Sequence, residues 1–251
     1  MTHAEKDTMN YPSLLKPRLS ATALALIVVL GSLILLRGTI ATAQSQQLAE
    51  KLMALKQNQA TNKQKLAQYT WQETETISIK GNVKDTKVYQ VQMVNGQQQK
   101  TEASNQKAQS GGREGRLKEH AIEKKTEEYE QYGQQIGALA KQYTTPDPDR
   151  LMQAKQAGNI SLQPGGGTVS LVIKNYVKQG DSITFTIDPQ SKQVQNVRVA
   201  SYLNDPKDAV TISAEFAQLP DGTNHVANTL INGVSKQLTV NDQNSNYQKA
   251  M

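Results

Sequence analysis

Alternation between apolar and polar residues most strongly constrains the fold of this chain. Beyond Ile160, apolar side chains take every second position in successive short segments, which is the period of a strand with one buried face. Turn sequences separate these segments: Lys178 to Asp181, Asp188 to Lys192, Asn204 to Lys207 and Leu219 to Gly222. The pattern predicts an antiparallel meander of about seven strands. Its last hairpin is expected around Asn232-Gly233, followed by a polar, frayed tail from Asp242.

The same alternation occurs earlier in the chain, where Trp71 and Ile77 fall on one parity. Gly81-Asn82 and Asn95-Gly96 are turn sequences of the kind that join hairpin strands. We therefore expect two strands in a hairpin and a third strand from Gln97 to Ala103.

Between these two sets of strands the period changes to that of a helix. Apolar residues recur at steps of three and four from Leu117 to Tyr143, in a segment otherwise rich in Lys, Glu and Gln. A second helix is expected from Asp149 to Ala157, ended by Gly158-Asn159. Because each strand has only one apolar face, we expect the helices to cover that face.

An apolar, uncharged run from Ala21 to Leu36 precedes all of these elements. Basic residues lie before it, and Ala41-Thr42-Ala43 after it is similar to the sites that signal peptidase cleaves. The run is shorter than the roughly 20 residues of a membrane-spanning helix, yet Arg37 at its end would suit an uncleaved anchor. Both alternatives stay open, and in both the chain from Gln44 onward is exported.

Together these patterns predict an α+β fold. An N-terminal apolar signal or anchor helix would be followed by a strongly curved antiparallel β-sheet, an unclosed β-barrel, covered by amphipathic helices. The expected divisions are a leader with signal peptide or membrane anchor at residues 1–43, a helical spacer at 44–68, the sheet domain at 69–241 with a helical insertion at 115–158, and a polar tail at 242–251.

The residue inventory narrows the possible functions. Cysteine is absent, which excludes disulfides, thiolate metal sites, thiol nucleophiles and a lipid-modified cysteine. The 28 Lys plus Arg only mildly exceed the 22 Asp plus Glu and form no basic cluster with aromatics, so nucleic acid is not an expected partner. His120 and His225 lack the neighbours that catalytic and metal-binding motifs place at fixed spacing. We therefore expect no enzyme activity, no cofactor and no metal.

Glu73 and Glu75 stand out because they share the strand parity of Trp71 and so lie on an otherwise apolar face. Such a carboxylate pair is either an acid/base site or, more commonly, the polar end of a strand or the rim of a cavity.

Several short sequences are similar to those of a set of exported bacterial proteins with no known activity. They are Tyr69-Thr70-Trp71, Lys80-Gly81, Tyr89-Gln90-Val91, Asn175 to Asp181, Asp205 to Val210 and Leu219 to Thr223. In element order, the chain from Tyr69 to Asn241 resembles the LolA/LolB lipoprotein carriers of the bacterial periplasm. That resemblance implies an open antiparallel barrel with helices across its mouth and a lipid or lipoprotein ligand, and it carries over no site residue.

Two functions fit this inventory. One is a non-enzymatic cell-envelope protein that binds a lipid or another amphipathic molecule between sheet and helix, in the periplasm or anchored to the inner membrane through Ala21 to Leu36. The alternative is a structural or protein-interaction scaffold of the envelope with a fully packed core. A monomer is expected in either case. The candidate wall of a ligand cavity consists of Trp71, Tyr129, Tyr132, Ile136, Phe185 and Phe216.

Overall fold

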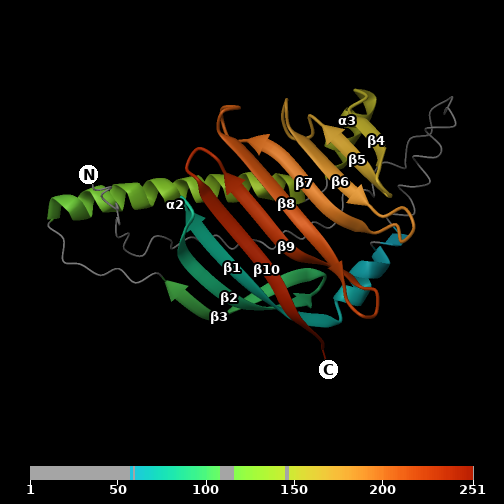
Figure 1. Ribbon diagram of the computed structural model, residues 1–251, viewed down its shortest axis with the longest axis horizontal. Helices are drawn as coiled ribbons and strands as arrows, with labels where there is room; N and C mark the ends of the chain where they lie inside the picture. Colours follow the sequence, from blue (N-terminus) through green and yellow to red (C-terminus); the bar gives the residue numbers. More distant parts are fainter. Residues whose placement is uncertain (1–56, 59, 108–115, 145–146, 251) are drawn as a thin grey trace, which may run out of the picture.

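The computed structural model describes residues 57–58, 60–107, 116–144 and 147–250, and the predicted signal or anchor segment lies outside them. In this part of the chain the main feature is one antiparallel sheet of ten strands that does not close into a barrel (Figure 1). The strand order is β3-β2-β1-β10-β9-β8-β7-β6-β5-β4. The strands are β1 (Tyr69–Ile79), β2 (Asn82–Val94), β3 (Gln97–Lys107), β4 (Ile160–Gly165), β5 (Thr168–Lys174), β6 (Ser182–Ile187), β7 (Val194–Tyr202), β8 (Ala209–Gln218), β9 (Asn224–Gly233) and β10 (Leu238–Lys249). The predicted unclosed antiparallel sheet is confirmed.

Two tight turns join the first three strands. Lys80 and Gly81 both have positive φ, and so do Asn95 and Gly96. Two successive residues in the left-handed region form the hairpin turn whose twist matches that of the flanking strands. The first turn is one residue earlier than predicted. β3 continues past the predicted end at Ala103 because its backbone stays paired with β2 as far as Lys107.

The C-terminal strand differs most from its prediction. The predicted polar tail from Asp242 is not frayed, because β10 extends to Lys249 and pairs with β1 along its length, from Leu238 opposite Ile79 to Lys249 opposite Tyr69. Because the side chains after Asp242 are polar, the sequence lacks the apolar alternation that would predict a strand there. The strand is held between β1 and β9 by its backbone hydrogen bonds.

The last hairpin also turns later than predicted. Gly233 is the final residue of β9, and the turn follows it. A Cβ atom at Gly233 would lie 2.4 Å from Ile136 Cδ1 and 2.6 Å from Tyr132 Cε1. Glycine is needed here because the strand backbone lies directly against a helix, which leaves no room for a methyl group.

Two helices pack on the sheet. Figure 1 shows α2 (Arg116–Thr144) lying across the strands near the end of β9 and the start of β10. α3 (Pro148–Gln156) is capped at its N-terminus by Asp147, whose Oδ1 accepts hydrogen bonds from the backbone N–H groups of Asp149 and Arg150. We call the sheet face that packs against these helices the inner face. Its core includes Ile77, Phe185, Val199, Ile212, Ile231 and Val240 from the strands, and Tyr129, Tyr132, Ile136, Leu139, Tyr143 and Leu151 from the helices.

Two tyrosine hydroxyl groups fasten α2 to loops of the sheet. Tyr132 Oη donates to Asp208 Oδ1 at 2.8 Å. Tyr143 Oη donates to Asp181 Oδ2 at 2.6 Å and lies 2.7 Å from Ser201 Oγ. Each hydroxyl group lies at the end of a buried ring and forms a hydrogen bond with a polar group of the sheet. The helix is therefore held both by packing and by hydrogen bonds.

A short helix precedes β1. Residues 57–58 and 60–66 are helical, within the predicted segment 44–68. Asn62 exchanges two hydrogen bonds with Asn224: its Nδ2 donates to the carbonyl oxygen, and its Oδ1 accepts from the backbone N–H. This helix is therefore attached to the start of β9. Among the described residues, no helix is both long and apolar enough to cross a membrane.

Candidate functional site

Charged side chains occupy the inner face at the β1 end of the sheet. Glu75 of β1 lies opposite Lys87 of β2 on one side and Asp242 of β10 on the other. Glu73 precedes Glu75 on the same face. We call the following six residues the charged cluster: Glu73, Glu75, Asp85, Lys87, Lys100 and Asp242.

Nearly the whole cluster is buried. Glu75 is 1% exposed and Glu73 is 2% exposed. Asp85, Lys87 and Asp242 are buried to a similar degree, and the side chain of Lys100 is 13% exposed. Taking four carboxyl groups and two ammonium groups out of water is costly unless each charge is paired.

Pairing inside the cluster is incomplete. Lys100 Nζ donates to Glu73 Oε1, and Lys87 Nζ lies 3.6 Å from Asp85 Oδ2 and 4.0 Å from Glu75 Oε1. Within the described part of the chain, Glu75 Oε1, Asp85 Oδ1 and Asp242 Oδ1 are buried without a hydrogen-bond partner. The cluster therefore contains carboxyl oxygens that a proton or a cation would satisfy.

Burial makes the carboxyl groups of Glu75 and Asp242 weaker acids. Burial raises the pKa of Glu75 to about 7, although the ammonium groups of Lys87 and Lys100 oppose the shift. Burial also raises the pKa of Asp242, and the carboxyl groups of Glu73 and Glu75 raise it further. Glu75 therefore stays partly protonated near neutral pH, where an exposed carboxyl group has lost its proton.

Four of the six predicted wall residues meet in the hydrophobic core. Tyr129, Tyr132, Ile136 and Phe185 are all buried there, where protein atoms surround them. Phe216 is partly buried and packs against the same core. The structure thus brings these residues together between helix and sheet, with the space under Ile136 and Tyr132 filled by the β9 backbone.

Trp71, the sixth predicted wall residue, lies beside the charged cluster instead. Its ring stacks on Tyr247 with ring centres 5.4 Å apart, and its Nε1 donates to Asn244 Oδ1 at 3.1 Å. Asn244 lies opposite Glu73 in the strand register. Trp71 is 2% exposed, so it forms an aromatic border to the cluster.

His225 belongs to this aromatic border. Its ring centre lies 4.2 Å from that of Tyr247, and its Nδ1 lies 3.1 Å from the carbonyl oxygen of Val226. Burial lowers the pKa of His225. This neutral, stacked histidine has the surroundings of a packing residue. In the part of the chain that the structure describes, no group of three or more His, Asp or Glu residues is placed to hold a metal ion.

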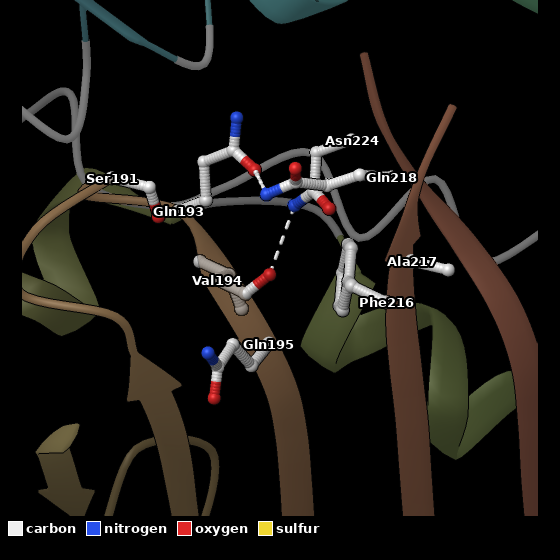
Figure 2. Close-up of a pocket in the computed structure, with 8 residues that line it drawn as sticks. All are labelled: Ser191, Gln193, Val194, Gln195, Phe216, Ala217, Gln218 and Asn224. Atoms are coloured by element: carbon white, nitrogen blue, oxygen red, sulfur yellow. Dashed lines mark hydrogen bonds between the residues drawn. The ribbon is translucent and has the colours of Figure 1, made fainter. Parts of the chain in front are cut away.

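A separate open pocket of about 330 Å³ lies where β7 begins and β8 ends. Figure 2 shows Gln218 Nε2 donating to Gln193 Oε1 at 2.5 Å and Asn224 Nδ2 donating to the carbonyl oxygen of Val194 at 2.9 Å. Phe216, a predicted wall residue, also lines it. Half of the eight lining side chains are neutral amides, and three of these four already form hydrogen bonds within the pocket. The lining therefore contains no group suited to acid/base chemistry.

The sequence indicated only part of the charged cluster. Glu73 and Glu75 stood out by parity, but Asp85, Lys87 and Asp242 did not. Asp85 and Lys87 alternate in β2 with outward residues, and this parity was the available signal. Asp242 had no such signal, because its strand was expected to end before it.

No protein-family model matches the sequence, and no curated protein matches it.

Proposed function

We propose that this chain is an exported, non-enzymatic protein of the bacterial cell envelope that binds an amphipathic molecule at the inner face of its sheet. The observation that supports this is a change of character along two neighbouring strands. In β1 the apolar Ile77 and the acidic Glu75 are neighbours on the same face. In β10 Val240 and Asp242 are neighbours in the same way. An apolar surface therefore borders a polar one, at the spacing of alternate strand residues, about 7 Å.

The site lies at the charged end of the sheet. The predicted wall under α2 is core, whereas Trp71 and the charged cluster combine an aromatic surface with carboxyl oxygens that have no partner. The polar part of an amphipathic ligand would lie at the cluster, whose apolar neighbours on the same strands are the buried Ile77 and Val240. The likeness in element order to the LolA/LolB carriers is consistent with this proposal, although a shared architecture is weak support for a shared function.

Fluorescence of Trp71 provides the test, because the chain has a single Trp and Trp71 lies on the same strand face as Glu73. We expect octylamine, octanoate or octanol, each below its micellar concentration, to change the emission of the purified protein with saturation. A chain with no saturable response to any of the three would contradict the proposal.

The alternative, an envelope scaffold with a packed core, is favoured by the contact between α2 and Gly233, where no methyl group fits. A missing response to all three probes would support it. Co-purified lipid, found by solvent extraction and mass spectrometry, would argue against it.

Export has its own test. A reporter enzyme that is active only outside the cytoplasm, fused after Met251, should be active in the intact cell. An inactive reporter on a folded fusion would contradict export.

A further inference from the structure

We propose that the charged cluster binds the cationic group of the ligand, a primary ammonium or a guanidinium group. This inference rests on the proposed function and specifies the polar part of its ligand.

The first argument is the balance of charge. The cluster holds four carboxyl groups, on β1, β2 and β10, and two ammonium groups, on β2 and β3. Lys100 bonds Glu73, and Lys87 lies between Asp85 and Glu75. Acid therefore exceeds base in a buried site, which favours a positively charged ligand over an anionic or neutral one.

The second argument is independent of charge and concerns hydrogen bonds. Glu75 Oε1, Asp85 Oδ1 and Asp242 Oδ1 are all buried and, among the described residues, lack a hydrogen-bond partner. Each of these side chains is more than nine-tenths buried. Buried acceptors without donors are rare in folded proteins. An ammonium group carries three N–H donors and a guanidinium group five, and neither has an acceptor, so both complement such a site.

The third argument separates an organic cation from a metal ion. The described residues hold no His, Asp and Glu group arranged as metal ligands. The residues that border the cluster on its inner face, Ile77, Val240 and Trp71, are apolar or aromatic and buried, and such surroundings favour an organic cation over a hydrated metal ion.

Protons compete with such a ligand. The groups that face Glu75 are Glu73 on its own strand, Asp85, Lys87 and Tyr89 on β2, Lys100 on β3 and Asp242 on β10. Without ligand, protons on the carboxyl groups reduce the excess negative charge. A bound ammonium group would displace them, so its affinity should increase with pH while that of a neutral ligand should not.

The experiment compares octylamine, octanol and octanoate by Trp71 fluorescence at pH 6 and pH 8. We expect octylamine to bind at least tenfold more tightly than the other two at pH 8, and this preference to shrink at pH 6. In the double variant Glu75→Gln, Asp242→Asn the preference for octylamine over octanol should disappear. Glu215→Gln, which removes an exposed carboxyl group on β8, is the matched control and should keep the preference.

The outcomes are distinct. Binding of the alkyl probes without preference for the amine, or a preference that survives in the double variant, would overturn this inference and leave the proposed function standing. No binding of any probe would refute the proposed function itself. Both amide substitutions conserve shape. Thermal unfolding of the double variant at pH 5, below the raised pKa of Glu75, should match that of the parent and show that the variant folds.

Discussion

Replacing Asp181 with Ala should destabilise the protein by roughly 3–5 kcal/mol. The Asp181 carboxylate is buried and accepts four hydrogen bonds. Its Oδ1 accepts from the backbone N–H of Tyr176 at 2.6 Å, and its Oδ2 accepts from the backbone N–H groups of Val177 and Lys178 and from Tyr143 Oη. Alanine would leave the backbone N–H groups of Tyr176, Val177 and Lys178 without this acceptor, and Tyr143 Oη with Ser201 Oγ as its remaining partner. Losing the acceptor of a buried donor costs more than the bond contributes when made.

The same substitution would loosen α2, because Tyr143 Oη attaches that helix to the Asp181 loop. Urea unfolding followed by far-ultraviolet circular dichroism measures the loss in free energy. Asp188→Ala is the matched control, since Asp188 Oδ1 also accepts two backbone N–H groups, from Gln190 and Ser191, but in an exposed turn. We expect the control to lose about 1 kcal/mol. Equal losses of unfolding free energy in the two variants would show that the buried hydrogen bonds of Asp181 stabilise the protein no more than those of an exposed turn.

Stability should decrease as the pH rises from about 4.5 to about 7, with Glu75 alone contributing roughly 3 kcal/mol. The reason is that the pKa of Glu75 is raised from 4.5 in the unfolded chain to about 7 in the folded protein. The folded state therefore binds this proton more tightly than the unfolded state does. Its contribution to stability is complete below pH 4.5 and is lost as the pH passes through 7. The raised pKa of Asp242 acts in the same direction.

Glu75→Gln isolates this effect, because the amide stays neutral at every pH. The difference in unfolding free energy between variant and parent, measured in urea at pH 4.5, 6 and 7.5, should shift in favour of the variant as the pH rises. Glu215→Gln, at an exposed position on β8, should show no such trend. A pH-independent difference for Glu75→Gln would mean that the carboxyl group is not held protonated by burial.

Local patterns were sufficient to predict most elements of the sheet and α2. The turn residues at Lys80-Gly81 and Asn95-Gly96 act through their own backbone angles, so the sequence around them carries the needed information. The stripe that contains Tyr132 and Ile136 likewise reports a helix by its period alone.

Features that depend on distant residues were harder to predict. β10 is held by its pairing with β1, and nothing within Asp242 to Lys249 repeats at an apolar strand period. The charged cluster combines residues from four strands, and burial of Asp85 and Lys87 depends on neighbours far along the chain. The predicted wall residues were identified correctly as inward on the helix and on β6, but parity cannot tell a packed core from a cavity.

The position of β10 gives the order of synthesis a role in folding. Among the described strands, β1 to β3 are made first, β4 to β9 follow, and β10, which pairs with both β1 and β9, is made last. Until β10 is available, β1 and β9 each present an unpaired edge, and the carboxyl group of Glu75 has no Asp242 opposite it. The two parts of the sheet are therefore expected to pair only after β10 has left the ribosome, which makes completion of the sheet a single late event in folding.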